Sequence, residues 1–327
     1  MAILSRVARG DFTESIHVTF GVIVNGKGEL IHSFGDPHYL TCIRSSLKPF
    51  QAAASIKAGA VDAAGFSEKE IALMCASHHG EKIHVDTAKS MISKLGYTVA
   101  HYECGSHYPA DRLSRYKEIK KGNEPLPYHN NCSGKHAGML SLAKFLDADP
   151  KGYTSQDHIV QKTIIGQLKE YLHLDDIPFG IDGCSAPTPF LTLVSIAQLF
   201  QKLGSNHYPE LKRAYQAMTH NPYMIAGRNN FDSLFTQALN GRGLTKGGGE
   251  AVRGISLKVS ETENWGIALK VLDGNARVMP IVVMTLLEKL ELLSKDELGS
   301  LGKFRTKIFK NHRGIHIGDI EVIIEDV

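Results

Sequence analysis

Near its N-terminus the chain reads His17-Val-Thr-Phe-Gly-Val-Ile-Val24, then Asn25-Gly-Lys-Gly28, then Leu30-Ile-His-Ser-Phe34. Branched and aromatic residues alternate in the first piece, and the third piece resumes that pattern, which favours β-strands. The piece between them is rich in residues that tolerate positive φ, as a tight turn between antiparallel strands requires. Together the three pieces predict a β-hairpin.

Beyond this hairpin the sequence is mainly helical and returns to strands only near its end. Helical spacing of apolar residues occurs at Lys48–Ala60, Glu68–Cys75, His84–Leu95, Lys135–Leu146, Ile159–Leu172, Phe190–Leu203, Tyr208–Met218 and Asp232–Leu239. Strand patterns recur at Arg253–Ser260, Trp265–Leu272 and Gly314–Glu325, with an amphipathic helix at Met279–Leu293. We therefore predict an α/β (α+β) fold with a central, mainly antiparallel sheet, flanking helices and an inserted helical lobe.

The composition is that of a folded globular protein. Of the 327 residues, 43% are hydrophobic and 22% are charged, values that exclude disorder as the main description. No Gly/Ser-rich linker and no internal repeat divides the chain, so we predict one two-lobed domain over residues 1–327. Because the formal net charge is only +3 and basic residues alternate with acidic ones, we expect no nucleic-acid partner.

The sequence also indicates a compartment. Arg6 and Arg9 interrupt the apolar start of the chain, so no signal peptide is visible. The longest apolar stretches, such as Met279–Leu287, are too short to cross a bilayer, and no membrane association is expected. The five cysteines are odd in number and widely spaced, which disfavours disulfides and leaves free thiols or metal ligands. We expect a cytoplasmic protein.

The first candidate for chemistry is Arg44-Ser45-Ser46-Leu47-Lys48-Pro49. Proline is tolerated only in the first turn of a helix, so a helix should begin close to Ser45 and leave its hydroxyl at the N-terminal end. Lys48 follows at i+3 on the same face and could take the serine proton, provided that its amine is neutral. The non-catalytic alternative is that Ser45 or Ser46 is a helix N-cap and that Lys48 is a solvated residue.

Three further segments are ambiguous by themselves. Cys75-Ala-Ser77-His78-His79-Gly-Glu81 is either the rim of a site or a polar helix terminus. In Asn130–His136, Cys132 and His136 could form a thiol–imidazole pair, although free cysteines are most often buried hydrophobes. Leu244–Glu250 holds three glycines, and a flexible surface loop is the default interpretation. The spacing of Cys132 and Cys184 assigns no zinc site.

Taken together, five ordered blocks resemble the L-asparaginase II family of the rhizobial type. They are Arg44-Ser45-x-x-Lys48-Pro49, Ala72–His78, Asn131–Leu140, Asp182-Gly183-Cys184-x-x-Pro187-Thr188-Pro189 and Leu269-Lys270-x-x-Asp273-Gly274-Asn275. The resemblance spans nearly the whole chain. It implies a fold like that of serine β-lactamases, penicillin-binding proteins and serine glutaminases, which agrees with terminal strands around a helical insertion. It also suggests a homodimer.

The resemblance further implies roles for individual residues. Ser45 matches the nucleophile and Lys48 its base, and Ser77 and Lys246 match a second Ser–Lys pair that assists proton transfer. A zinc ion is implied on ligands that match Cys132, Lys135 and Cys184; a lysine ligand requires its neutral form. For the substrate, Arg44 offers a bidentate match to the α-carboxylate, Asp182 can pair with the ammonium, and His136 can add a hydrogen bond.

The reaction implied is hydrolysis of L-asparagine to L-aspartate and ammonia through an aspartyl ester. Two alternatives stay open. One is a serine-dependent glutaminase or a β-lactamase-like acyl hydrolase, because one methylene in a pocket is worth only about 1–3 kcal/mol. The other is a non-catalytic, zinc-stabilised binding protein in which Cys132 and Cys184 only hold the inserted lobe. A cysteine hydrolase that uses Cys132 and His136 is a further possibility.

Overall fold

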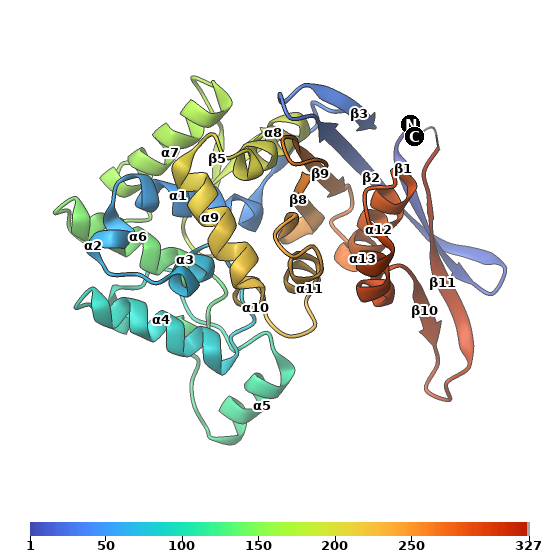
Figure 1. Ribbon diagram of the computed structural model, residues 1–327. Coiled ribbons are helices and arrows are strands. Elements are labelled where there is room, and N and C mark those ends of the chain that lie inside the picture. The colour runs from blue at the N-terminus through green and yellow to red at the C-terminus, as the bar shows by residue number, and fades with distance from the viewer. Residues whose placement is uncertain (326–327) are drawn as a thin grey trace.

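The protein, seen here in a computed structural model that describes residues 1–325, is built around one antiparallel sheet (Figure 1). The strand order is β10-β11-β1-β2-β9-β8-β7, and β3 pairs with the second half of β2. The strands are β1 (Ile3–Arg9), β2 (Phe12–Val24), β3 (Leu30–Phe34), β7 (Gly243–Gly248), β8 (Val252–Lys258), β9 (Asn264–Val271), β10 (Lys307–Lys310) and β11 (His316–Ile323). Strands from both ends of the chain thus share one sheet, as predicted.

A helical lobe is inserted between β3 and β7 (Figure 1, left). A small sheet of order β4-β6-β5 connects it to the rest, with β4 (Leu40–Cys42), β5 (Phe179–Ile181) and β6 (Pro187–Thr192). Its helices are α1 (Lys48–Lys57), α2 (Ala60–Ala63), α3 (Glu68–Met74), α4 (Lys82–Lys94), α5 (Arg112–Lys120), α6 (Ser133–Phe145), α7 (Ile159–Leu172), α8 (Leu193–Gly204), α9 (Pro209–His220), α10 (Pro222–Ile225) and α11 (Phe231–Ala238). The predicted antiparallel sheet with an inserted helical lobe is confirmed.

The helix α1 lies at the centre of this lobe. Its sequence, Lys-Pro-Phe-Gln-Ala-Ala-Ala-Ser-Ile-Lys, is buried from Lys48 to Ile56. Small residues all around a helix suit such a position because neighbouring helices can then approach from every side. Pro49 stands in the first turn, and the 3₁₀ helix η1 (Arg44–Leu47) leads directly into α1. The predicted helix start near Ser45 is therefore confirmed.

Two hydrophobic cores lie on the two faces of the sheet. One joins α8 and the helical lobe to the face that carries Val22 and Val24. The other lies under α12 (Met279–Lys289) and the neighbouring α11 and α13 (Lys295–Ser300), on the face that carries Ile23. Successive residues of β2 therefore point into different cores, as the period of two in a strand requires. The one-domain prediction for residues 1–327 stays a prediction, and its last two residues lie outside the described ones.

Two predicted helix boundaries and one predicted loop were wrong. The predicted helix Phe190–Leu203 begins only at Leu193, because Pro187 and Pro189 hold an extended backbone in β6 and the Thr192 side chain caps the helix. The helix predicted to reach Ala60 breaks at Gly59, which has a φ of 87°. The predicted flexible surface loop at Leu244–Glu250 is largely the strand β7. The strands β1 and β10 were not predicted.

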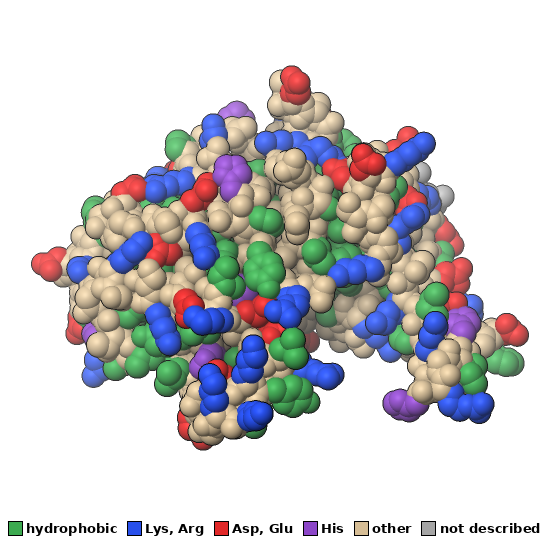
Figure 2. Space-filling model, turned by 60° about the horizontal axis from the view of Figure 1, so that its bottom comes forward, with side chains coloured by type: hydrophobic (Ala, Val, Ile, Leu, Met, Phe, Trp, Pro, Cys, Tyr) green, Lys and Arg blue, Asp and Glu red, His purple; other side chains and the backbone are tan. Residues whose placement is uncertain are grey.

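The outer surface bears charges of both signs. On the face shown in Figure 2, Lys and Arg side chains alternate with Asp and Glu rather than forming one basic area. Among residues 1–325, no helix is both long and apolar enough to span a membrane.

Candidate active site

Ser45 lies where η1 meets the sheet. The backbone N–H of Ile43 donates to Pro189 in β6, and the buried Ser46 hydroxyl donates to the carbonyl of Lys246 in β7 at 2.8 Å. Arg44 adopts a left-handed conformation with a φ of 51°. Its neighbour Ser45 is half-buried at the start of the 3₁₀ helix, where backbone N–H groups lack intrahelical acceptors.

Lys48 is buried and does not reach the Ser45 hydroxyl in this structure. Its amine donates to the carbonyls of Ala76 at 2.6 Å and Asn131 at 3.0 Å, and lies 3.0 Å from Ser77 Oγ. Within residues 1–325, no hydrogen bond joins Lys48 to Ser45. The alternative of a solvated Lys48 was wrong because its side chain is only 1% exposed. The predicted direct Ser45–Lys48 contact is absent, and a Lys48–Ser77 contact takes its place.

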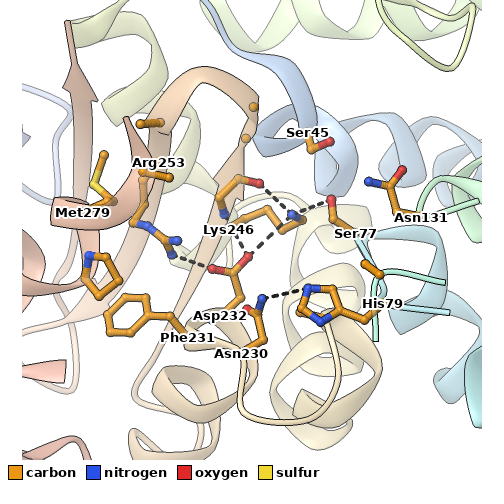
Figure 3. Close-up of a pocket in the computed structure, with 18 of the residues that line it drawn as sticks. Ser45, Ser77, His79, Asn131, Asn230, Phe231, Asp232, Lys246, Arg253 and Met279 are labelled. Carbon is orange, nitrogen blue, oxygen red and sulfur yellow. Dashed lines mark hydrogen bonds and ion pairs between the residues drawn. The ribbon is translucent and has the colours of Figure 1, made fainter. Parts of the chain in front are cut away.

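Ser77 joins two lysines. It follows α3 in a loop, and its own backbone N–H donates to the carbonyl oxygen of Ile225 at 2.9 Å. Its hydroxyl lies 2.9 Å from Lys246 Nζ (Figure 3). It also lies 3.0 Å from Lys48 Nζ. The structure therefore brings together the predicted pair Ser77 and Lys246, which are separated by 169 residues in the sequence.

Lys246 is fully buried, and its surroundings set its acidity. Burial lowers the pKa of Lys246 to about 8, while the Asp232 carboxylate, 3.6 Å from its amine, works in the opposite direction. A pKa near 8 leaves part of the lysine neutral at physiological pH, so this amine can accept a proton. Burial thus favours the base form of Lys246.

Asp232 organises this side of the site. It accepts hydrogen bonds from Arg253 Nη1 at 2.5 Å and from the Gly247 backbone N–H at 2.9 Å (Figure 3). Burial by itself would raise the pKa of Asp232, but Arg253 and Lys246 outweigh burial and hold that pKa below its usual range. Asp232 is therefore an anion in contact with two cations.

The glycines of β7 allow the strand to lie close to η1. A Cβ atom at Gly248 would be 2.8 Å from the Ile43 carbonyl oxygen and 2.6 Å from Val252 Cγ1. Only glycine fits such a distance, so the run Gly247–Gly249 is a close-packed strand end beside Ser45 rather than a flexible loop.

These side chains open onto a cleft of about 520 Å³. Ser45, Ser77, Asn131, Asp232 and Lys246 line it together with the end of β7. The Ser77-His78-His79 segment also contributes to its wall, as a site rim would, and its role in a functional site stays a prediction. In Figure 3, Ser45, Ser77 and Asn131 lie on one side of Lys246, and Phe231, Arg253 and Met279 lie on the other.

On the other side of Ser45, the predicted substrate-binding residues contact each other. Arg44 Nε donates to Asp182 Oδ1 at 2.9 Å. Together with Lys48, Lys135 and Thr188, this ion pair borders a narrow gap next to Ser45 that has no room for a water molecule. A substrate that uses Arg44 and Asp182 would therefore have to separate them.

The three predicted metal ligands converge. Cys132 precedes α6, Lys135 lies in its first turn, and Lys135 Nζ donates to Cys184 Sγ at 2.9 Å. All three side chains are buried. The N-terminus of α6 can approach α3 so closely because residue 134 is a glycine, whose Cβ would lie 2.2 Å from the Leu73 carbonyl oxygen. This packing brings Cys132 and Lys135 close to Lys48.

The chemistry of this donor set suits a thiophilic metal ion. A hydrogen bond from the Cys184 thiol lowers the pKa of Cys132 well below its usual value, and the same bond raises the pKa of Cys184. Although burial opposes it, the pKa of Lys135 is raised by the two sulfur atoms. The described residues contain no group of three or more His, Cys, Asp or Glu side chains placed to hold a metal, and this set has only two such residues. Two sulfurs and one nitrogen are nonetheless donor atoms of the kinds that zinc takes, on condition that Lys135 binds the ion as a neutral amine.

His136 lies apart from the cleft. Its Nδ1 is 2.6 Å from the Tyr153 hydroxyl, and its buried Nε2 has no partner within residues 1–325. Cys132 Sγ, in turn, lies 3.2 Å from Asn131 Oδ1, and no hydrogen bond joins it to His136 among the described residues. The geometry gives no support to a Cys132–His136 pair, and a substrate contact for His136 stays a prediction.

Sequence reasoning missed Asp232 and Arg253. Arg253, Ile255 and Leu257 are alternate residues of β8 and therefore point to the same face of the sheet, and all three are buried. A cation on the core-facing side of a strand requires a buried anion, so this pattern was a usable signal. Asp232 gave no comparable signal, because an Asn-x-Asp start is ordinary for a helix such as α11.

Comparisons with known proteins place the chain in a family. Two solved structures of Mglu resemble it, one in its native form in 4.3 M NaCl and one in a tris and glutamate form. Each is 14% identical, with TM-scores of 0.38 and 0.36, and they cover 86% and 88% of this chain. The chain spans 63% of the length of each. A search among curated proteins gave no match. The model of the family described as L-asparaginase II matches residues 5–322, and the chain belongs to the L-asparaginase II family.

Proposed function

We propose that the protein is an amidohydrolase that converts L-asparagine to L-aspartate and ammonia through an aspartyl ester on Ser45. The family supports amide hydrolysis as the class of reaction. The observation that carries the proposal is the chain Lys48–Ser77–Lys246, in which two buried amines lie 3.0 and 2.9 Å from one hydroxyl in the wall of the cleft that holds Ser45.

Ser45 is the serine that this arrangement can activate. It is half-buried in the wall of the cleft, and no hydrogen bond within residues 1–325 occupies its hydroxyl. The adjacent backbone N–H at the start of η1 could stabilise the oxyanion formed on attack. Lys48 acts as the base, and its contact with Ser45 forms when substrate binds, because catalytic hydrogen bonds often tighten only in the complex.

The Ser77–Lys246 pair moves the proton onward. In the first half-reaction, the Ser45 oxygen bonds to the side-chain amide carbon, the carbon–nitrogen bond breaks, and the serine proton passes along this chain to the leaving nitrogen. In the second, a water oxygen bonds to the ester carbon, the bond from that carbon to the Ser45 oxygen breaks, and a proton from the water passes to the Ser45 oxygen. Two easier steps replace one difficult step.

Arg44 and Asp182 bind the α-carboxylate and the α-ammonium, respectively. Their mutual ion pair supports this assignment, because it holds one charge of each sign beside Ser45. Replacing Arg44 with alanine should raise KM for L-asparagine by roughly 10- to 100-fold, since a hydrogen bond to a charged group is worth about 1.5–3 kcal/mol. Arg44→Lys, which keeps the charge, should lose less. An unchanged KM in steady-state assays of Arg44→Ala would refute the assignment.

Asp232 positions Lys246 and sets the pH at which it can act. The groups that face Lys246 are Asp232, Lys48, Arg253 and Cys132. If neutral Lys246 is the working form, kcat/KM should rise with pH through about 8. Removing the anion favours the neutral amine, so Asp232→Asn should shift this rise in kcat/KM to lower pH. Asp232→Glu keeps the anion and should leave the rise near the pH at which it occurs in the wild type. If kcat/KM of Asp232→Asn rises at the same pH as that of the wild type, Asp232 does not set the pH at which Lys246 acts.

Zinc is proposed as a cofactor on Cys132, Lys135 and Cys184. When bound, it would supply a positive charge and a Lewis acid beside the nucleophile. We expect about one zinc ion per chain by elemental analysis of the purified protein. Cys184→Ser should remove most of it, while Cys42→Ser, outside this cluster, should not. Equal zinc content in both variants would contradict this site. The homodimer remains a prediction.

The function itself is tested by measuring ammonia release from L-asparagine and L-glutamine side by side. The proposal expects release from asparagine to be the faster reaction. Release from glutamine alone would favour the glutaminase alternative, and release from neither would overturn the proposed function.

A further inference from the structure

Ser45 separates two spaces of very different size. On one side is the narrow gap bordered by Arg44, Asp182 and Lys135. On the other is the open cleft of about 520 Å³, which Ser77 and Lys246 line. A substrate attacked by Ser45 therefore has one part in a confined, charged space and another part in a roomy one.

The direction of proton transfer decides which part of the substrate faces the cleft. This step rests on the proposed function. The leaving nitrogen must receive a proton from the Ser77–Lys246 pair, and both side chains lie in the cleft wall. The charged α-groups belong with Arg44 and Asp182 on the opposite side. The leaving nitrogen consequently points into the cleft.

The cleft is far larger than ammonia, the leaving group of the proposed reaction, requires. Ammonia is about as large as water, whose share of liquid volume is about 30 Å³. By contrast, the volume of about 520 Å³ lies within the range of about 300–1,000 Å³ that is typical of pockets for much larger ligands. Substituents on the leaving nitrogen can therefore be accommodated without any change in the position of the reacting atoms.

The far wall of the cleft is apolar and aromatic. Phe231, Met279, Pro280 and Phe304 contribute to it. The Phe231 and Phe304 rings pack edge to face with centroids 4.8 Å apart, and the Arg253 guanidinium lies 4.8 Å from the Phe231 ring centre. Ammonia gains nothing from such a surface. An aromatic substituent would gain from burial against it.

We propose that the site also cleaves β-amides of L-aspartate whose leaving group is an aromatic amine. The atoms balance as for asparagine. The Ser45 oxygen bonds to the amide carbon, the bond from that carbon to the aryl-bearing nitrogen breaks, and the serine proton converts this nitrogen to a neutral arylamine. Water then hydrolyses the same aspartyl ester, so the two substrates differ only in the first half-reaction.

The test compares L-aspartic acid β-(4-nitroanilide) with L-asparagine, using the full chain. The release of 4-nitroaniline is followed by absorbance, and the release of ammonia by a coupled assay. We expect hydrolysis of both substrates by the wild type and of neither by Ser45→Ala. Hydrolysis of asparagine without any hydrolysis of the nitroanilide would overturn the inference while leaving the proposed function intact. Hydrolysis of neither by the wild type would overturn the proposed function, and the inference with it.

A second variant tests the location. Ala276 is an exposed residue in the cleft wall, so Ala276→Trp would fill space there at little cost to folding. The ratio of kcat/KM for the nitroanilide to that for asparagine should fall by at least about tenfold. Ala63→Trp, at an exposed alanine of α2 outside the cleft, should leave this ratio unchanged. An unchanged ratio in Ala276→Trp would show that the aromatic group lies elsewhere.

Discussion

Replacing Ser45 with alanine is expected to abolish ammonia release from L-asparagine, with a loss of about 10⁴- to 10⁶-fold in kcat. The variant lacks the oxygen on which the ester is proposed to form, whereas the two lysines and Ser77 remain in place. Because no hydrogen bond within residues 1–325 uses the Ser45 hydroxyl, Tm should stay within about 1 °C of the wild type. The measurements are steady-state kinetics and a thermal melt of the same preparation.

Ser46→Ala is the matched control for this prediction. The Ser46 hydroxyl is buried and donates to the Lys246 carbonyl at 2.8 Å, so its loss should cost about 1–3 kcal/mol and lower Tm by roughly 2–4 °C. Its activity should stay within a few-fold of the wild type. We thus expect opposite results for the two adjacent serines: Ser45→Ala should lose activity and keep its stability, and Ser46→Ala should lose stability and keep its activity. A Ser45→Ala variant that retains activity would remove Ser45 from the mechanism.

Ser77→Ala should have the second largest effect. The substitution removes the one atom that contacts both Lys48 and Lys246 and leaves the backbone bond from Ser77 to Ile225 intact. We expect kcat to fall by about 10²- to 10⁴-fold, the usual range for a lost proton-transfer group, with little change in KM. Stopped assays at saturating asparagine measure this directly.

Ser55→Ala serves as the control for the same chemical change at a remote position. Ser55 lies on α1 with Lys48, and its buried hydroxyl donates to Gly138 at 2.9 Å, outside the cleft. It should lose stability and retain activity. If Ser77→Ala and Ser55→Ala have the same kcat, Ser77 has no part in proton transfer.

The fold was predictable where periodicity acts locally. The hairpin of residues 17–34 and the strands of residues 253–272 and 314–325 were predicted from alternation, and the structure places them in one sheet. β7 was missed because three of its six residues are glycine, a composition typical of loops. One of them, Gly248, is required by the close approach to Ile43 and Arg44 at the start of η1, a contact between segments about 200 residues apart that no local pattern reveals.

The site was predictable only in part for the same reason. The Ser45 and Lys48 positions follow from the helix start that Pro49 indicates, and the helix start was correct. The spacing also suggested a direct contact between them, but the Lys48 amine turns to Ala76, Ser77 and Asn131. Polar groups held by tertiary structure compete for the amine, and they are invisible in the local sequence. The Ser77–Lys246 pair came from the family resemblance alone.

Mass spectrometry of the acid-quenched reaction can show whether an acyl group forms on Ser45. The protein is mixed with L-asparagine, quenched within the first turnovers and digested. We expect an aspartyl ester on the peptide that contains Ser45 and none in Ser45→Ala. An aspartyl group on Cys132, or on any side chain other than Ser45, would contradict the proposed mechanism.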